Sequence, residues 1–226
     1  MSSQGPPQGA VPRLVRPGPL RERVYEALLE LITTRALPPG RHLVETELAG
    51  HLGVSRQPVR EALQRLNTEG WVDLRPAQGA FVHEPTRQEA DQLLAVRTLL
   101  EAEAARLAAA HADEAGVEAL RSLCAQGERA VAEDDVDAAA VLNVRFHAKV
   151  MELAGNKVLA KLAAQVDRRV RWYRTPVADR QCGGRSWAEH RGLADAIADR
   201  DQQGATRLMR EHTEHTRACC HEQAQS

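Results

Sequence analysis

The chemistry that the sequence suggests most directly is the reading of DNA bases by one short helix. Residues 53–66, GVSRQPVREALQRL, place Arg56, Gln57 and Arg60 in the first turn and a half of a predicted helix. An arginine guanidinium can donate two hydrogen bonds to guanine O6 and N7, and a glutamine amide can pair with adenine. In a helix-turn-helix, the first residues of the second helix reach the base edges. The alternative is a solvated amphipathic helix, which would carry the same polar residues.

The residues around this helix favour DNA reading. Gly53 can adopt the positive φ that a tight turn between two helices requires. Ser55 is a good N-cap, whose hydroxyl would accept a hydrogen bond from a free N–H of the first turn. Pro58 lies in that turn, where it removes no intrahelical bond. Apolar residues recur at helical spacing and would face a core, namely Val59, Leu63 and Leu66.

A second set of residues has the chemistry of a metal site. Asn143 and His147 are four positions apart and therefore share one face of a predicted helix. His190 and His212 lie on two further predicted helices. Three imidazoles and an amide oxygen that converge in a helical bundle would suit Zn²⁺, Ni²⁺ or another first-row divalent ion. Nine histidines are spread along the chain, however, so these residues can instead hydrogen-bond one another or water.

Helices and a pair of strands must position these residues. We predict a helix over 20–34, a short helix over 45–52 and the helix that follows Ser55. Residues 69–85 then read as strand, turn and strand, which completes a winged helix-turn-helix with a small two-stranded wing. The remaining chain predicts an all-α bundle, so the fold is mainly α. The predicted bundle helices are 87–110, 114–133, 137–154, 157–176, 187–200 and 202–222, with capping boxes formed by Thr86 with Glu89 and by Ser186 with Glu189.

The composition is ordinary for a globular protein and argues against several classes. The net charge is −1, so any attraction for DNA must be local. The four cysteines form no CxxC pair, which argues against a disulfide framework and favours free thiols in a reducing cytoplasm. Residues 1–18 lack the apolar segment of a signal peptide, so we expect a disordered tail. No apolar run approaches the length of a membrane span, and we expect no membrane association.

Residues 20–82 resemble the N-terminal domain of GntR-type bacterial transcription regulators. The motifs follow the family in order: PPG before the second helix, VSRQPVREAL, and EGW with a glycine-bearing wing. Residues 96–109, 143–162, 186–197 and about 205–216 resemble the FCD-type effector domain of the FadR-like branch. The resemblance implies a DNA-binding domain over 19–85 and an effector-binding and dimerisation domain over 86–222.

The resemblance also implies contacts with operator DNA. Family members touch the operator through arginines at the positions of Arg56 and Arg60 and through the wing tip, here 77–79. A further family contact falls on Thr46, where some members carry Arg, so this chain departs from the pattern there. Together with the residue chemistry above, the expected DNA-binding residues are Ser55, Arg56, Gln57, Arg60 and Gly79.

Many FCD-type domains bind a divalent metal through an acidic residue and three histidines. By resemblance these positions fall on Asn143, His147, His190 and His212. Asn143 replaces the usual Asp and brings no charge, which should weaken metal binding and strengthen the attraction for an anionic ligand. Arg97 stands where family members often direct an arginine toward the effector, and it would clamp a carboxylate or else pair with Glu101 one turn away. We therefore expect a small carboxylate as the effector.

The predicted function is sequence-specific regulation of transcription, with repression favoured over activation. A homodimer would bind a short palindromic operator in double-stranded DNA and respond to an organic acid. Two alternatives belong to other classes. One is a metal-dependent hydrolase that uses the three histidines, although the chain has no HExxH helix. The other is a DNA architectural protein with a structural helical half, since fold does not determine function.

Overall fold

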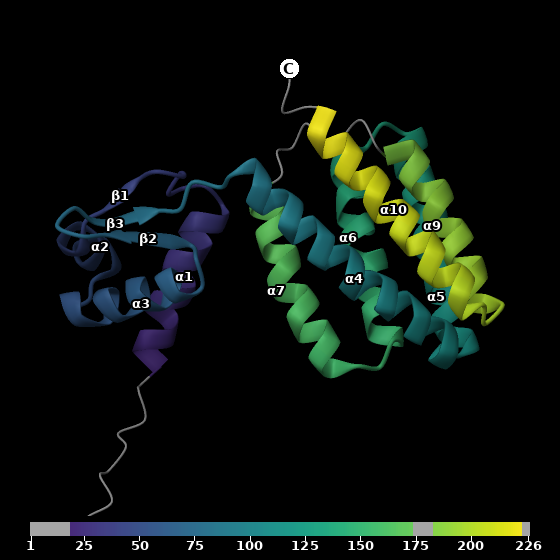
Figure 1. The fold of residues 1–226 in the computed structure, drawn as a ribbon. Coiled ribbons are helices and arrows are strands. Elements are labelled where there is room, and N and C mark those ends of the chain that lie inside the picture. Colours follow the sequence, from purple (N-terminus) through teal and green to yellow (C-terminus); the bar gives the residue numbers. More distant parts are fainter. Residues whose placement is uncertain (1–18, 174–182, 223–226) are drawn as a thin grey trace, which may run out of the picture. The chain divides into compact units, whose positions relative to one another are not determined.

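The computed structural model describes residues 19–173 and 183–222. The chain divides into two compact units at residues 84 and 85. In its described part, the first unit contains three helices and a small sheet, and the second contains helices (Figure 1). The tail predicted at 1–18 lies outside the described residues.

The N-terminal unit is a winged helix-turn-helix. Its elements are α1 (Pro19–Thr33), β1 (His42–Leu43), α2 (Glu45–Leu52), α3 (Arg56–Thr68), β2 (Val72–Arg75) and β3 (Gly79–Val82). The strands form an antiparallel sheet in the order β1-β3-β2, with Val72 opposite Val82 and His42 opposite Phe81. The predicted wing is thus present as β2 and β3. A third strand, β1, joins it, and two residues are too few to show an alternating pattern in the sequence.

Apolar stripes on α1 and α3 form the core of this unit, because the two helices pack against each other. Its buried members include Leu28, Ile32, Val59, Leu66, Val72 and Val82. The φ angle of Gly53 is 65° and that of Gly70 is 74°, so both glycines take the left-handed conformation at the ends of α2 and α3. The conformation of Gly53 confirms the turn that the sequence predicts, and Gly70 ends α3 in the same way.

Ser55 occupies the N-cap position of α3, but its hydroxyl makes no capping hydrogen bond, so this part of the prediction is wrong. An N-cap side chain accepts a bond from the second or third helical N–H. The third residue of α3 is Pro58, which has no N–H to donate. Ser55 is exposed, and its hydroxyl therefore remains accessible beside the start of the helix.

The C-terminal unit confirms the predicted helical bundle. Its described helices are α4 (Arg87–His111), α5 (Glu114–Ala132), α6 (Val136–Leu153), α7 (Lys157–Tyr173), α9 (Gly183–Ala198) and α10 (Gln202–Glu222). α10 runs along α4 and α9, and α5 packs against α6 and α9 (Figure 1). Four fully buried alanines on α4, Ala104, Ala105, Ala108 and Ala109, keep the surface of this helix flat where its neighbours approach.

The two predicted capping boxes have different outcomes. The Thr86 hydroxyl accepts a hydrogen bond from the Glu89 N–H at 3.2 Å, and the Glu89 carboxylate accepts one from the Thr86 N–H at 2.8 Å. The box predicted at Ser186 is wrong, because α9 begins at Gly183 and Ser186 lies inside it. The carboxylate of Glu189 instead faces two histidines of α10.

Two further findings concern the bundle. Cys124 on α5 is a free, buried cysteine, and burial raises the pKa of its thiol to about 12, so it stays protonated and unreactive. None of the described helices combines the length and apolar character needed to cross a membrane.

Candidate DNA interface and candidate metal centre

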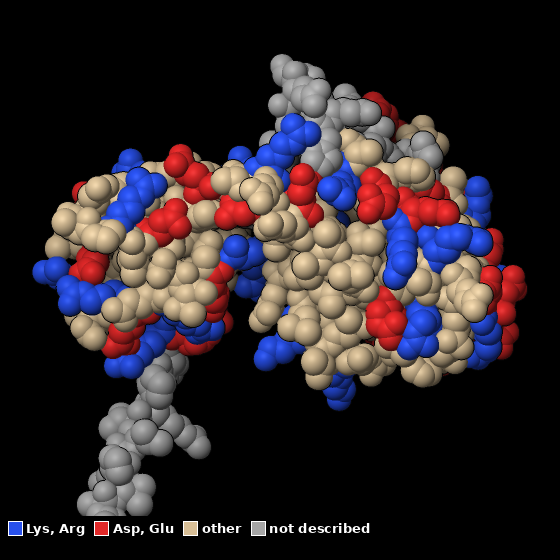
Figure 2. Space-filling model, in the orientation of Figure 1, with Lys and Arg blue, Asp and Glu red and all other residues tan. Residues whose placement is uncertain are grey.

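The outer face of α3 carries the predicted DNA-reading side chains. The inner face of the helix is buried in the core, and the helical period therefore leaves Arg56, Gln57 and Arg60 exposed. Gln57 donates a hydrogen bond to Glu61 on the same helix at 2.8 Å. Lys and Arg are interspersed with Asp and Glu over the N-terminal unit in the view of Figure 2. The face of this unit that Figure 2 shows therefore carries no broad basic surface.

Both arginines contact one carboxylate at the start of α2. Arg60 donates to Glu45 Oε1 and Oε2 at 2.9 and 2.8 Å, and Arg56 donates to Oε2 at 3.3 Å. The hydrogen bond from Arg60 lowers the pKa of Glu45, and the same bond raises the pKa of Arg60. Both groups therefore stay charged at neutral pH. Sequence reasoning missed Glu45, because only the turn at Gly53 brings it close to α3.

A groove lies between α3 and the wing. The arginines of α3 line one side, and Arg75 and Gly79 line the other. The ring of Phe81 supports this wall, because His42 stacks on it with centroids 4.7 Å apart and the Arg75 guanidinium lies over it at 4.3 Å. Gly79 has a φ of 101°, and a Cβ there would lie 2.9 Å from His42 Nε2. The wing tip thus requires glycine. His42 and Arg75 are groove residues that sequence reasoning did not identify.

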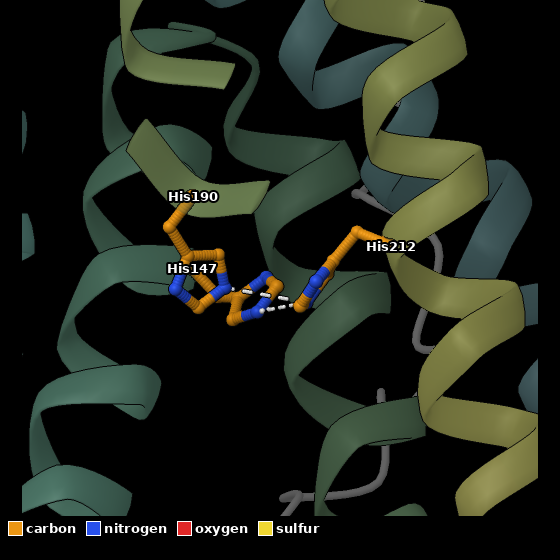
Figure 3. Close-up of side chains that lie close together, drawn as sticks. All are labelled: His147, His190 and His212. Carbon is orange, nitrogen blue, oxygen red and sulfur yellow. Dashed lines mark hydrogen bonds between the residues drawn. The ribbon is translucent and has the colours of Figure 1, made fainter. Parts of the chain in front are cut away.

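Three of the four predicted metal ligands come together in the bundle (Figure 3). His147 on α6, His190 on α9 and His212 on α10 are all buried. The Nε2 atom of His212 lies 3.2 Å from Nε2 of His190 and 3.2 Å from Nε2 of His147. One nitrogen from each imidazole lies within 4.8 Å of the other two. Phe146 stacks on His190 at 4.2 Å and holds that ring in place.

Two carboxylates orient two of these rings from behind. Nδ1 of His212 lies 2.9 Å from Glu189 Oε2. Nδ1 of His147 lies 3.3 Å from Glu101 Oε2, without the alignment of a hydrogen bond. A carboxylate accepts a proton in such a contact, so a pair of neutral rings that both direct Nδ1–H at these carboxylates would each keep the lone pair on Nε2. The lone pairs of His147 and His212 then face each other at 3.2 Å.

Hydrogen bonding alone does not satisfy this arrangement. A proton on Nε2 of His190 can fill the short distance to His212, but no proton remains for the distance between His212 and His147. Two nitrogens bound to one zinc at 2.0–2.1 Å and at 90–110° would be about 2.9–3.4 Å apart. The two observed distances of 3.2 Å fall in this range. Two of the three nitrogen pairs therefore have the spacing of ligands on one divalent ion, and the third pair lies within 4.8 Å.

The charge state of the cluster also suits a metal. Burial lowers the pKa of His190 and of His212, and neighbouring imidazoles lower both further. Neutral imidazole is the form that binds metal. Burial alone would raise the pKa of Glu101, but Arg97 and then His147 outweigh it, so the pKa lies below its usual range. A fully buried carboxylate thus stays ionised behind His147. Sequence reasoning considered Glu101 only as a partner of Arg97 and missed this role.

Asn143 and Arg97 are placed differently from the histidines. Asn143 lies one turn before His147 on α6 and is half-buried, and within the described residues no hydrogen bond joins its amide to the cluster. Arg97 contacts Glu101 Oε1 at 2.8 Å and Asp167 Oδ1 at 3.1 Å. The ion pair with Glu101, one of the two alternatives for Arg97, is therefore present. Through Glu101, Arg97 is connected to His147.

Comparisons with known proteins agree with this architecture. Residues 20–82 match the family model of bacterial regulatory proteins of the gntR family, and residues 92–215 match that of the FCD domain. The Nta operon transcriptional regulator of Aminobacter aminovorans is 30% identical over 77% of this chain and 81% of its own. The HTH-type transcriptional repressor RspR of Escherichia coli is 29% identical over 66% of this chain and 68% of its own.

A solved structure supports the fold. Escherichia coli McbR/YncC superposes with a TM-score of 0.66 at 24% identity and covers 91% of this chain and 98% of its own. At that identity the likeness concerns the fold alone. The matched families and relatives are transcription regulators, which argues against the hydrolase alternative.

Proposed function

The chain belongs to the GntR family of bacterial transcription regulators and carries an FCD domain, and from this premise we propose that it is a homodimeric repressor controlled by a small carboxylate. The observation that carries the DNA-binding part is the pair of exposed arginines on α3 beside the groove to the wing. The observation that carries the effector part is the convergence of three buried histidines in the bundle.

DNA recognition in this proposal uses α3 and the wing together. Arg56, Gln57 and Arg60 project from the first turns of α3, where a recognition helix meets the base edges of the major groove. The Ser55 hydroxyl and the uncapped N–H groups of α3 would hold a phosphate oxygen, as helix N-termini do. The backbone at Gly79 would approach a neighbouring sugar or phosphate, since a side chain there would collide with His42.

The metal would be held by Nε2 of His147, His190 and His212. When bound, the ion would offer open coordination positions to an anionic ligand. Glu101 and Glu189 orient the rings and hold their protons on Nδ1, which keeps the lone pairs directed at the ion. Asn143 would add an amide oxygen without charge, so the ion would keep most of its attraction for a carboxylate.

The effector we propose is a small organic acid that meets both the metal site and Arg97. An arginine fork binds a carboxylate through two hydrogen bonds. Arg97 already contacts Glu101 and Asp167, so an effector carboxylate would compete with these residues for the guanidinium. This competition would link occupancy of the site to the packing of α4 against α7.

The homodimer would form through the face of the bundle where α4 and α7 lie side by side. Large apolar side chains are exposed on both helices, namely Val96, Leu99, Val158 and Leu162. Charged side chains are sparse over the middle of this face in Figure 2. Exposed apolar patches of this kind mark interfaces, and a two-fold axis would place two winged helices on the halves of a palindrome.

The sign of regulation rests on the relative RspR, which is named a repressor. A reporter fused to an operator found by selection tests this directly. Repression predicts that expression rises when the gene for this chain is deleted.

The DNA-binding proposal is tested by selecting duplexes from a random pool with the full-length protein. Arg60→Ala should weaken binding to the selected duplex by roughly 1–3 kcal/mol and leave the dimer intact. Arg23→Ala is a matched control, since it removes the same charge from an exposed position on α1. A wild-type protein that enriches no sequence, or an Arg60→Ala variant that binds the selected duplex as tightly as wild type, would refute the assignment of α3.

A further inference from the structure

Glu45 accepts hydrogen bonds from both of the α3 arginines that we propose to contact DNA bases. It is the first residue of α2, and its carboxylate reaches across the Gly53 turn to the outer face of α3. Both of its oxygens accept from Arg60, and one also accepts from Arg56. An acidic residue at a DNA-binding surface would by itself repel the phosphates of the duplex. Its presence therefore needs a compensating role.

The geometry of Arg60 indicates that role. A guanidinium has two edges that can each donate a pair of hydrogen bonds, one formed by Nε with Nη2 and one by Nη1 with Nη2. Glu45 occupies the first edge, with Nε at 2.9 Å and Nη2 at 2.8 Å from its oxygens. The second edge is left to donate outward, and this is the fork that matches O6 and N7 of guanine.

We propose that Glu45 is a positioning residue that locks Arg60 with its outer edge toward the bases and so sets the sequence selectivity of the protein. The inference rests on the proposed function of α3. An unrestrained arginine samples many rotamers and can turn to any nearby phosphate, and binding must then fix the side chain at an entropic cost. Held by Glu45, Arg60 gains little from a phosphate and keeps its contact for a matching base pair.

The charge of Glu45 acts in the same direction. It offsets one of the two positive charges on the outer face of α3, and hence reduces the attraction for duplex of any sequence. The low pKa of Glu45, caused first by its hydrogen bond to Arg60, keeps this charge in place at neutral pH. Arg56 contacts Glu45 at the longer distance of 3.3 Å, and its side chain is 60% exposed compared with 48% for Arg60. Arg56 is therefore held less firmly, and Arg60 is the residue that Glu45 orients.

The test compares full-length wild type with Glu45→Gln, Arg60→Ala and the double variant. Duplexes are first selected from a random pool by the wild type. Binding is then measured at constant salt to the selected duplex, to each of its single base-pair variants and to a random duplex of the same length. Glu47→Gln is the matched control, because it removes the same charge from an exposed position two residues further along α2.

A good bidentate contact between arginine and guanine discriminates against the wrong base by about 5- to 150-fold. Glu45→Gln should lose most of this discrimination at the base pair where Arg60→Ala also loses it, and the double variant should lose no more than Arg60→Ala. Binding of Glu45→Gln to the random duplex should be several-fold tighter than wild type, since removal of one negative charge strengthens phosphate attraction. Glu47→Gln should keep the wild-type discrimination at every position.

Two results would overturn the role of Glu45 while leaving the proposed function of α3 intact. One is full discrimination by Glu45→Gln at every base pair of a duplex that the wild type selects. The other is a loss of discrimination by Glu45→Gln at a base pair where Arg60→Ala keeps its discrimination, together with additive losses in the double variant. A wild-type protein that selects no sequence would overturn both proposals together. Circular dichroism and thermal melting of each variant exclude a loss that arises from misfolding.

Discussion

Gly127 lies against Trp187, which packs on the histidine cluster, and its replacement by alanine tests the packing described above. Gly127 lies on α5, and a Cβ at this position would come within 2.2 Å of two ring atoms of Trp187 on α9. Trp187 cannot easily yield, because its ring packs edge-on against Phe146 at 6.4 Å and against His190 at 4.8 Å. A shift of the indole would therefore displace a proposed metal ligand.

Two opposing effects determine the size of the change. Gly→Ala inside a helix is favourable by about 0.5–1 kcal/mol, because alanine loses less conformational freedom on folding. Forcing an extra carbon into a close-packed core costs about 1–3 kcal/mol. The matched control is Gly192→Ala on α9, where an added Cβ meets no atom within 4 Å. Both substitutions replace a helical glycine by alanine and therefore share the gain in helix propensity. The difference between their free energies of unfolding thus measures the clash with Trp187.

We expect Gly127→Ala to be less stable than Gly192→Ala by about 1–3 kcal/mol. Urea unfolding of the full-length protein, followed by far-ultraviolet circular dichroism, measures this difference. Gly127→Ala should also bind Zn²⁺ more weakly than Gly192→Ala in chelator competition, because Trp187 contacts His190. Equal stability of the two variants would refute the packing of Trp187, and equal metal affinity would refute its link to the cluster.

The metal centre, its protonation and the dimer face can be tested separately. Glu189→Gln removes the charge that orients His212, so the affinity for Zn²⁺ should fall about 10- to 100-fold. Glu211→Gln is the control. An unchanged affinity of the Glu189→Gln variant would contradict the tautomer assigned to His212. The folded-state pKa values of His190 and His212 lie below 6.5, so below that pH the unfolded chain binds more protons than the folded chain. The free energy of unfolding should therefore fall as the pH falls below about 6.5, by up to roughly 1.4 kcal/mol per pH unit for each group. A flat stability between pH 7.5 and 5.5 would argue against their burial as neutral groups. Leu99→Glu on α4 should yield monomers in sedimentation, whereas Val141→Glu on α6 should not, and a dimeric Leu99→Glu would place the interface elsewhere.

The elements that position both sites could be predicted from the sequence because they depend on local signals. The apolar spacing of α3 determines which face is buried, so the exposure of Arg56 and Arg60 follows from the helical period. Gly53 and Gly70 mark the turns for the same reason, since few other residues adopt a positive φ there. The histidines could be assigned to three helices, although their convergence depends on how the helices pack.

Two of the roles that were missed depend on contacts between different helices. Glu45 reaches Arg60 over a turn, and Glu189 reaches His212 between α9 and α10. Periodicity reports which residues share a face but not which residue of another helix that face meets. The absent Ser55 cap is a different case, because the sequence already shows a weakened cap: proline at the third helical position removes one of the two N–H groups that the cap can bind.

Charge balance in the bundle would couple the binding of the proposed metal to the binding of the proposed effector. Glu101 is fully buried and ionised, and it depends on Arg97 for compensation. An anion that reached Arg97 alone would have to displace carboxylates that already lie at 2.8 and 3.1 Å, and Glu101 would be left uncompensated in the core. A divalent ion held by His147 would add positive charge near Glu101 and so reduce that cost. By thermodynamic linkage, an anion that binds more tightly with the ion present must strengthen the binding of the ion by the same factor.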